Sequence, residues 1–280
     1  MQMIPKPSLK AYQFNPEVKA VGRLSAYQKR VYFNQLERIR GKHQRAMRRN
    51  LRTVFDAQCE AVLDIEEPDF QTISRAVLNE NPMLEKVFEY TYTSIADDIY
   101  PMVEKTTKVK AVWEGFEKKS VDTDLYYRAH LLQWIQDNCA MKISEINDTT
   151  IREIQKLYEQ SANMIQFRDK VENLFQGSIK PYRANAIART ETTSASSRAS
   201  LETAKSTGFE GSKVWNCVPD MDTRETHMML DGRTIGMDDL FTWTGKYGYV
   251  QMDCPGDGTH GAPAGEIINC RCYPTYELDI

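Results

Sequence analysis

The chain has 280 residues, of which 41% are hydrophobic and 27% charged, and its net charge at pH 7 is -3. This composition is typical of a folded globular protein of about two domains and excludes a disordered chain. The acidic balance argues against a protein that coats nucleic acid with its whole surface. No run of ~18 uncharged apolar residues and no signal-peptide core occurs, so we expect a cytoplasmic protein with no membrane partner.

The chain opens with a predicted extended arm and a long helix. Residues 1–24 combine three prolines with isolated aromatic residues, which favours an arm over a packed element. Residues 25–63 carry apolar side chains at spacings of three and four, the pattern of an amphipathic helix. Gly41 is the expected position of a kink, because glycine costs about 1 kcal/mol relative to alanine within a helix.

The opposite face of this helix is strongly basic. Two interpretations stay open: a solvated face, or contact with DNA phosphates or an acidic partner through Arg45, Arg48, Arg49 and Arg52. Against the single acid Glu37, the basic residues of this face are Lys29, Arg30, Arg38, Arg40, Lys42, Arg45, Arg48, Arg49 and Arg52.

Further helices complete a helical domain over residues 25–140. Their apolar periodicity places Cys59 and Cys139 in the core. The predicted segments are 71–79, 83–108 and 123–140.

Three more helices are predicted before residue 209. A capping box at Thr150-x-x-Glu153 opens the first, and a second, short helix ends near Phe175. Ser178 and Pro181 open the third, which ends at Gly208. Its many alanine, serine and threonine residues predict a spine against which other backbones pack closely.

The last part of the chain predicts a small α+β module from about residue 209. Alternation from Lys213 to Val218 indicates a strand, and Asp222 caps a short helix that ends at Gly232. Beyond Thr242 we expect little regular structure. The predicted fold class is α+β, with a mainly helical N-terminal two-thirds containing long helices.

The module concentrates residues that bind zinc. The stretch 243–266 is rich in glycine and needs something to hold it in place, because long structureless loops are uncommon in compact domains. The preferred ligands are His227, Cys254, Cys270 and Cys272, with Cys217 or His260 as substitutes. The other interpretation is that these side chains only pack within the core.

Five separated motifs resemble, in order, the Mu F-type phage head morphogenesis family, over roughly residues 140–276. We therefore place a Mu F-like domain at 141–276. In one departure, Glu266-Ile-Ile stands where many relatives have a histidine before the Asn-Cys-Arg-Cys run. The motifs are Arg183–Glu191, Lys213–Trp215, Asp222–Gly232, Pro255–Asp257 and Glu266–Cys272. The positions that the family pattern picks out are Arg189, Thr190, Glu191, Asp222, Arg224, His227, Asp231, Gly232, Asn269, Cys270, Arg271 and Cys272.

The resemblance implies a minor capsid protein that acts in head assembly and in DNA packaging or ejection. The implied partners are the portal protein, the major capsid or scaffold protein, and packaged DNA. The implied location is the head interior or portal vertex, and the host cytoplasm during assembly. The family carries no settled catalysis, so we assign no catalytic residue.

An enzyme is the alternative function. Asp222, Arg224 and His227 lie within six residues and, with zinc, contain the groups of a metal-dependent nuclease. Arg189 and the Ser/Thr run at 192–197 suggest an ADP-ribosyl transferase-like enzyme, although the run falls within a helix rather than on a strand. Pairing of arginines with carboxylates is an ordinary structural use, which favours a structural protein.

Overall fold

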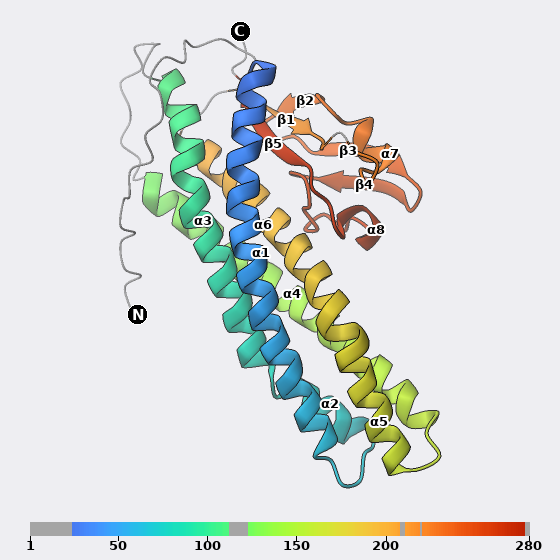
Figure 1. The fold of residues 1–280 in the computed structure, drawn as a ribbon. Coiled ribbons are helices and arrows are strands. Elements are labelled where there is room, and N and C mark those ends of the chain that lie inside the picture. The colour runs from blue at the N-terminus through green and yellow to red at the C-terminus, as the bar shows by residue number, and fades with distance from the viewer. Residues whose placement is uncertain (1–23, 112–122, 208–210, 219, 278–280) are drawn as a thin grey trace.

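The computed structural model describes residues 24–111, 123–207, 211–218 and 220–277. It confirms the α+β class: long helices form a bundle, and a small module with strands lies beside one end of it (Figure 1). The arm predicted over 1–24 lies outside the described residues except for its last residue, as does Gly208. The helices of the bundle are α1 (Ala26–Leu63), α2 (Phe70–Leu78), α3 (Asn81–Ala111), α4 (Thr123–Glu159), α5 (Met164–Leu174) and α6 (Ala184–Ser206).

Helix α1 matches the prediction for residues 25–63. It begins at a capping box, in which the Ser25 side chain accepts from the Gln28 amide and the Gln28 side chain accepts from the Ser25 amide. It runs unbroken through Gly41, and its apolar stripe, which includes Leu36, Met47 and Leu51, is fully buried. No helix among the described residues is both long and apolar enough to cross a membrane.

The structure corrects two predicted helix starts. Thr150 is buried inside the continuous helix α4, where its hydroxyl donates to the carbonyl of Ile146 at 2.9 Å instead of capping a new helix. Ser178 and Pro181 lie in a π-helical segment, Phe175–Arg183, that joins α5 to α6 (Figure 1). The wider π turn tolerates proline, which has no N–H to donate.

Helix α6 is the packing spine that its composition predicts. Most side chains from Thr190 to Ser206 are buried, and the helix contacts α1, α3, α4 and the last strand. The module also approaches it closely: a Cβ at Gly256 would lie 3.4 Å from Cα and N of Ser194. Small side chains are required where backbones come this near to each other.

In its described residues, the module contains two small antiparallel sheets and two short helices. Strand β1 (Ser212–Asn216) lies between β2 (Thr234–Gly236) and β5 (Tyr273–Glu277). The short helices are α7 (Glu225–Met228) and α8 (Ala264–Ile267). Helix α7 begins after Arg224, so the predicted cap at Asp222 is wrong.

The expectation of little regular structure beyond Thr242 is also wrong. A hairpin forms from β3 (Phe241–Gly245) and β4 (Gly248–Met252), in which Trp243 lies opposite Val250. Gly248 closes its two-residue turn at φ +105°, a conformation that glycine adopts readily. Gly248, one of the glycines that suggested a loop, therefore serves a tight turn.

Candidate functional site

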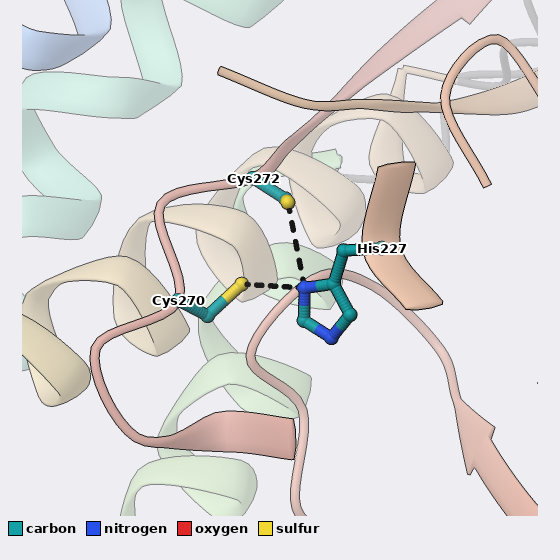
Figure 2. Close-up of side chains that lie close together, drawn as sticks. All are labelled: His227, Cys270 and Cys272. Carbon is teal, nitrogen blue, oxygen red and sulfur yellow. Dashed lines mark hydrogen bonds between the residues drawn. The ribbon is translucent and has the colours of Figure 1, made fainter. Parts of the chain in front are cut away.

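Three candidate ligands meet in the interior of the module. Nδ1 of His227 lies 3.6 Å from Sγ of Cys270 and 3.6 Å from Sγ of Cys272, as Figure 2 shows. His227 comes from α7, whereas both cysteines come from the segment that leads into β5. All three side chains are at most 2% exposed. We call these three residues the His/Cys cluster.

Cys217, one of the two substitutes, lies beside this cluster. Its Sγ is 3.4 Å from Sγ of Cys272 and donates to the carbonyl oxygen of His227 at 2.9 Å. Cys254 does not join the cluster, because its side chain packs in the hydrophobic core of the bundle. Cys270 and Cys272 belong to a separate core within the module. The structure thus separates Cys254 from the three residues that it brings together.

His260, the other substitute, belongs to a different group. Its Nε2 lies 3.3 Å from Asp253, which also pairs with Arg198 at 3.0 Å and with the fully buried Lys213 at 3.6 Å. Burial lowers the pKa of Lys213, and the negative charge of Asp253 opposes this lowering. Asp253, Asp257 and His260 together could hold a metal ion. However, the charges of Arg198 and Lys213 already balance those of the two aspartates.

Glu266 lies against the far side of the His227 ring. Its Oε2 is 3.2 Å from Nε2 of His227 and accepts from the hydroxyl of Thr226 at 3.1 Å. Both side chains are at most 2% exposed. A Cβ at Gly245 would lie 2.6 Å from Oε1 of Glu266, so only glycine leaves room for this carboxylate. Sequence reasoning treated Glu266 only as a departure from the family pattern.

The cluster favours a thiolate at Cys270. Hydrogen bonding with Cys272, and then with His227, holds the pKa of Cys270 well below its ordinary value of 9.0, in spite of burial. The pKa of Cys272 is raised because its neighbours Cys217 and Cys270 engage its thiol and because it is buried. A buried thiolate next to an imidazole can bind a metal ion or act as a nucleophile.

Other family-motif residues hold the backbone around the cluster. Thr190 on α6 accepts from the amide of Asn269 at 3.0 Å, and Asn269 adopts a left-handed conformation at φ 59°. Arg224 donates to the carbonyl of Ile268. The loop that carries Cys270 is therefore attached to both α6 and α7.

Asp231 and Gly232 attach the end of β1 to the turn after α7. Asp231 accepts from the amide of Cys217 at 2.7 Å, and Gly232 donates to the carbonyl of Trp215 at 2.8 Å. Gly232 stands at φ +76°, which explains glycine at this position. Arg271 forms an ion pair with Asp220, and Oδ2 of Asp222 lies 3.8 Å from Nη2 of Arg271.

Arg40 was expected on the exposed basic face, but it is only 4% exposed. Its guanidinium donates to the carbonyls of Arg271 and Cys272, each at 3.1 Å, and to the hydroxyl of Ser196 at 2.8 Å. A long side chain can cross from α1 to α6 in this way because its apolar stem packs while its planar head meets several acceptors. Arg40 therefore joins α1, α6 and the cluster segment.

Glu191 lies in a buried polar chain within the bundle. The hydroxyl of Tyr92 donates to its carboxylate and accepts from Asn138 at 2.8 Å. Burial raises the pKa of Glu191 above its usual value of 4.5. The residue supports the packing of α3, α4 and α6.

Arg189, on α6, is one of the motif residues that the fold leaves exposed. It lines a pocket of about 290 Å³ between α1, α6 and the module. The other lining residues are polar or charged: Glu37, Arg40, Gln44, Thr192, Thr193, Asp222 and Arg271.

The four predicted contact arginines of α1 divide into two pairs. Arg45 and Arg49 are exposed. Arg48 donates to the side chain of Asn185 at 3.1 Å, and Arg52 donates to the backbone carbonyl of Lys180, in the π-helical segment, at 3.2 Å. The second pair is therefore partly occupied by contacts within the protein.

The convergence of the motifs agrees with a family comparison. Residues 137–275 match the family described as phage Mu protein F like protein. This part of the chain belongs to the Mu F-like family. The Mu F-like region begins within α4, ends in β5 and contains all five motifs. Its membership relates the chain to phage head proteins.

One curated protein is similar over much of the chain. It is the NAD(+)--arginine ADP-ribosyltransferase EFV of Enterococcus faecalis (strain ATCC 700802 / V583), which is 27% identical over 219 residues. The alignment covers 66% of this chain and 43% of the relative, so the chain spans less than half of that protein's length. No solved structure matches the chain.

Proposed function

We propose that this protein is a minor head protein of a tailed phage that acts in head assembly and in DNA packaging or ejection at the portal vertex. The observation that carries the proposal is that side chains of the Mu F-like motifs hold other segments of the protein in place. Thr190, Arg224 and Asp231 bind backbone groups of neighbouring segments. Residues used in this way stabilise a module for assembly, whereas catalysis needs side chains free to meet a substrate.

The exposed arginines of α1 supply the proposed contact surface. Arg45 and Arg49 are four residues apart, so they lie on one face of the helix, and Arg189 is exposed in the pocket lined by the adjacent Gln44. Acidic side chains of a portal, capsid or scaffold protein, or phosphates of packaged DNA, would pair with these guanidinium groups. The protein would then lie in the head interior or at the portal vertex.

Charge reversal in the infecting phage tests this role. The double variant Arg45→Glu/Arg49→Glu should lower incorporation of the protein into heads, or DNA retention, several-fold. The matched control Arg152→Glu/Lys156→Glu reverses two exposed charges at the same spacing on α4. Heads that incorporate the α1 variant, retain DNA and eject it as well as the control would overturn the proposal.

An ADP-ribosyl transferase-like enzyme is the second candidate, favoured by the name of the similar enterococcal protein. Against it, the Ser/Thr run at 192–197 is buried inside α6, and the adjacent Glu191 is buried as well. Within the run, Thr192 and Thr193 line the pocket beside Arg189, but each is at most 3% exposed. Release of nicotinamide from NAD by the purified protein, lost in Arg189→Ala, would favour this candidate over the head role.

A metal-dependent nuclease remains the third candidate. The three residues that suggested it serve other contacts: Arg224 binds a backbone carbonyl, His227 is buried, and Asp222 is exposed beside Arg271. Cleavage of phage DNA by the purified protein, abolished by His227→Ala while heads still assemble, would favour the nuclease.

A further inference from the structure

We propose that Cys217, His227, Cys270 and Cys272 bind one structural zinc ion in a closed tetrahedral site, with Glu266 positioning the histidine. The inference does not depend on the role of the protein in the phage head. It replaces the preferred ligand Cys254 by Cys217 and adds a positioning residue that the sequence did not indicate.

The spacing of the His/Cys cluster fits tetrahedral zinc. With Zn–S near 2.3 Å and Zn–N near 2.0–2.1 Å, the tetrahedral angle places a nitrogen and a sulfur ligand about 3.6 Å apart. Nδ1 of His227 lies 3.6 Å from Sγ of both Cys270 and Cys272. The nitrogen and the two sulfurs are therefore already close to the positions of three ligand atoms in such a site.

Cys217 is the proposed fourth ligand; its sulfur lies against Cys272 but is not within 4.8 Å of every ligand atom of the His/Cys cluster. Two zinc-bound sulfurs should be about 3.8 Å apart, and Sγ of Cys217 is 3.4 Å from Sγ of Cys272. The Cys217 thiol donates to the carbonyl of His227, so it must turn from this oxygen to reach the metal. Cys254 and His260 are engaged elsewhere, in the bundle core and in the Asp253 ion pairs.

Glu266 selects the tautomer of His227 that the metal needs. A carboxylate 3.2 Å from Nε2 favours a proton on that nitrogen, which leaves the lone pair of Nδ1 directed at the two sulfurs. Metal-bound histidines usually carry such a carboxylate or carbonyl partner on their other nitrogen. Thr226 and Gly245 hold the carboxylate in place, as described above.

The surroundings suit a buried ion. Binding would release to solvent the protons that remain on the cysteine thiols, and three thiolates with Zn²⁺ would carry a net charge of -1. The guanidinium of Arg40, bound to the carbonyls of Arg271 and Cys272, supplies positive charge beside them. The indole rings of Trp215 and Trp243 stand 5.3 and 5.8 Å from the imidazole ring, and they limit access of water.

The proposed ion would stabilise the module rather than react. Its ligands come from the end of β1, from α7 and from the segment before β5, so one ion would cross-link three segments. Four protein ligands leave no coordination position for a catalytic water. A closed site is therefore expected to serve the fold and would not supply the metal of a nuclease.

Metal analysis of the full-length protein, purified without an affinity tag, tests the proposal. The wild-type chain should hold about one equivalent of zinc after incubation with Zn²⁺ and dialysis, as a closed four-ligand site predicts. Cys254→Ser and His260→Ala are matched controls that should retain the metal. Less than about half an equivalent in the wild type, or loss of zinc in Cys254→Ser, would overturn the ligand set.

Cobalt substitution tests the coordination directly. Co²⁺ in the wild-type site should show tetrahedral d–d bands and thiolate-to-metal charge-transfer absorption. In Cys217→Ser the charge-transfer absorption should fall by about a third, because one of three thiolates is gone. An unchanged spectrum in Cys217→Ser would refute the closed site. Glu266→Gln, which keeps the shape of the side chain, should weaken zinc binding roughly 10–100-fold while the far-UV circular dichroism stays unchanged. Unaltered affinity in that variant would refute the role of Glu266.

Discussion

Replacing Arg40 with methionine should destabilise the protein strongly, although the basic pattern of its helix suggests a surface residue. Methionine keeps much of the apolar stem and removes the guanidinium. The backbone carbonyls of Arg271 and Cys272 would then each lose the hydrogen bond that Arg40 donates. The hydroxyl of Ser196 would also lose its hydrogen bond from Arg40. These contacts join helices α1 and α6 to the segment that carries the cluster.

The expected loss follows from these contacts. A hydrogen bond to a charged group contributes about 1.5–3 kcal/mol, and an unsatisfied buried acceptor costs about 1–3 kcal/mol. Because the ion pair with Glu37 is partly exposed, it adds little. Allowing for the better solvation of methionine within a core, we expect the free energy of unfolding to fall by about 3–5 kcal/mol.

Urea unfolding followed by tryptophan fluorescence measures this loss, since Trp215 is fully buried in the module. Arg38→Met, an exposed arginine of the same helix, is the matched control and should change the free energy of unfolding by no more than about 0.5 kcal/mol. Arg40→Lys should fall between the two, because one ammonium cannot reach both carbonyls. A loss below about 1 kcal/mol in Arg40→Met would refute the reasoning.

Three further substitutions test the packing around α6. Burial raises the pKa of Glu191, so its contribution to stability is fully present below pH 4.5 and is lost as the pH rises through the folded-state pKa. The free energy of unfolding of Glu191→Gln should therefore rise relative to wild type between about pH 5 and pH 8; parallel pH profiles would contradict this. Tyr92→Phe removes the hydroxyl that links Glu191 to Asn138 and should cost about 1–3 kcal/mol in urea unfolding, whereas wild-type stability would contradict the buried chain. Gly256→Ala should lower the melting temperature more than Gly261→Ala, because both glycines have positive φ and only Gly256 is packed against α6; equal losses would show that the contact is unimportant.

Local signals predicted much of the fold. Helix α1 and the strand after Gly211 follow from hydrophobic periodicity, which depends only on neighbouring residues. Capping signals were less reliable: Thr150 and Ser178 have the residue types of helix starts, yet both lie inside longer helices. Tertiary packing decides whether such a side chain caps a helix or bonds to a carbonyl within one.

The hairpin of β3 and β4 shows the same limit. Its glycines resemble those of an irregular loop, and only the pairing of Trp243 with Val250 distinguishes a turn between strands. Pairing depends on what covers the strands, which sequence patterns describe poorly.

The sequence by itself determined the α+β class, the long first helix, the small-residue spine and the ordered motifs of the Mu F-like region. It also identified His227, Cys270 and Cys272 as candidate ligands by residue type. Only the tertiary structure separated Cys254 from them, placed Cys217 and Glu266 beside them and buried Arg40. The reason is physical: periodicity and residue type are local, whereas contacts between residues such as Arg40 and Cys272 arise from how helices and strands pack.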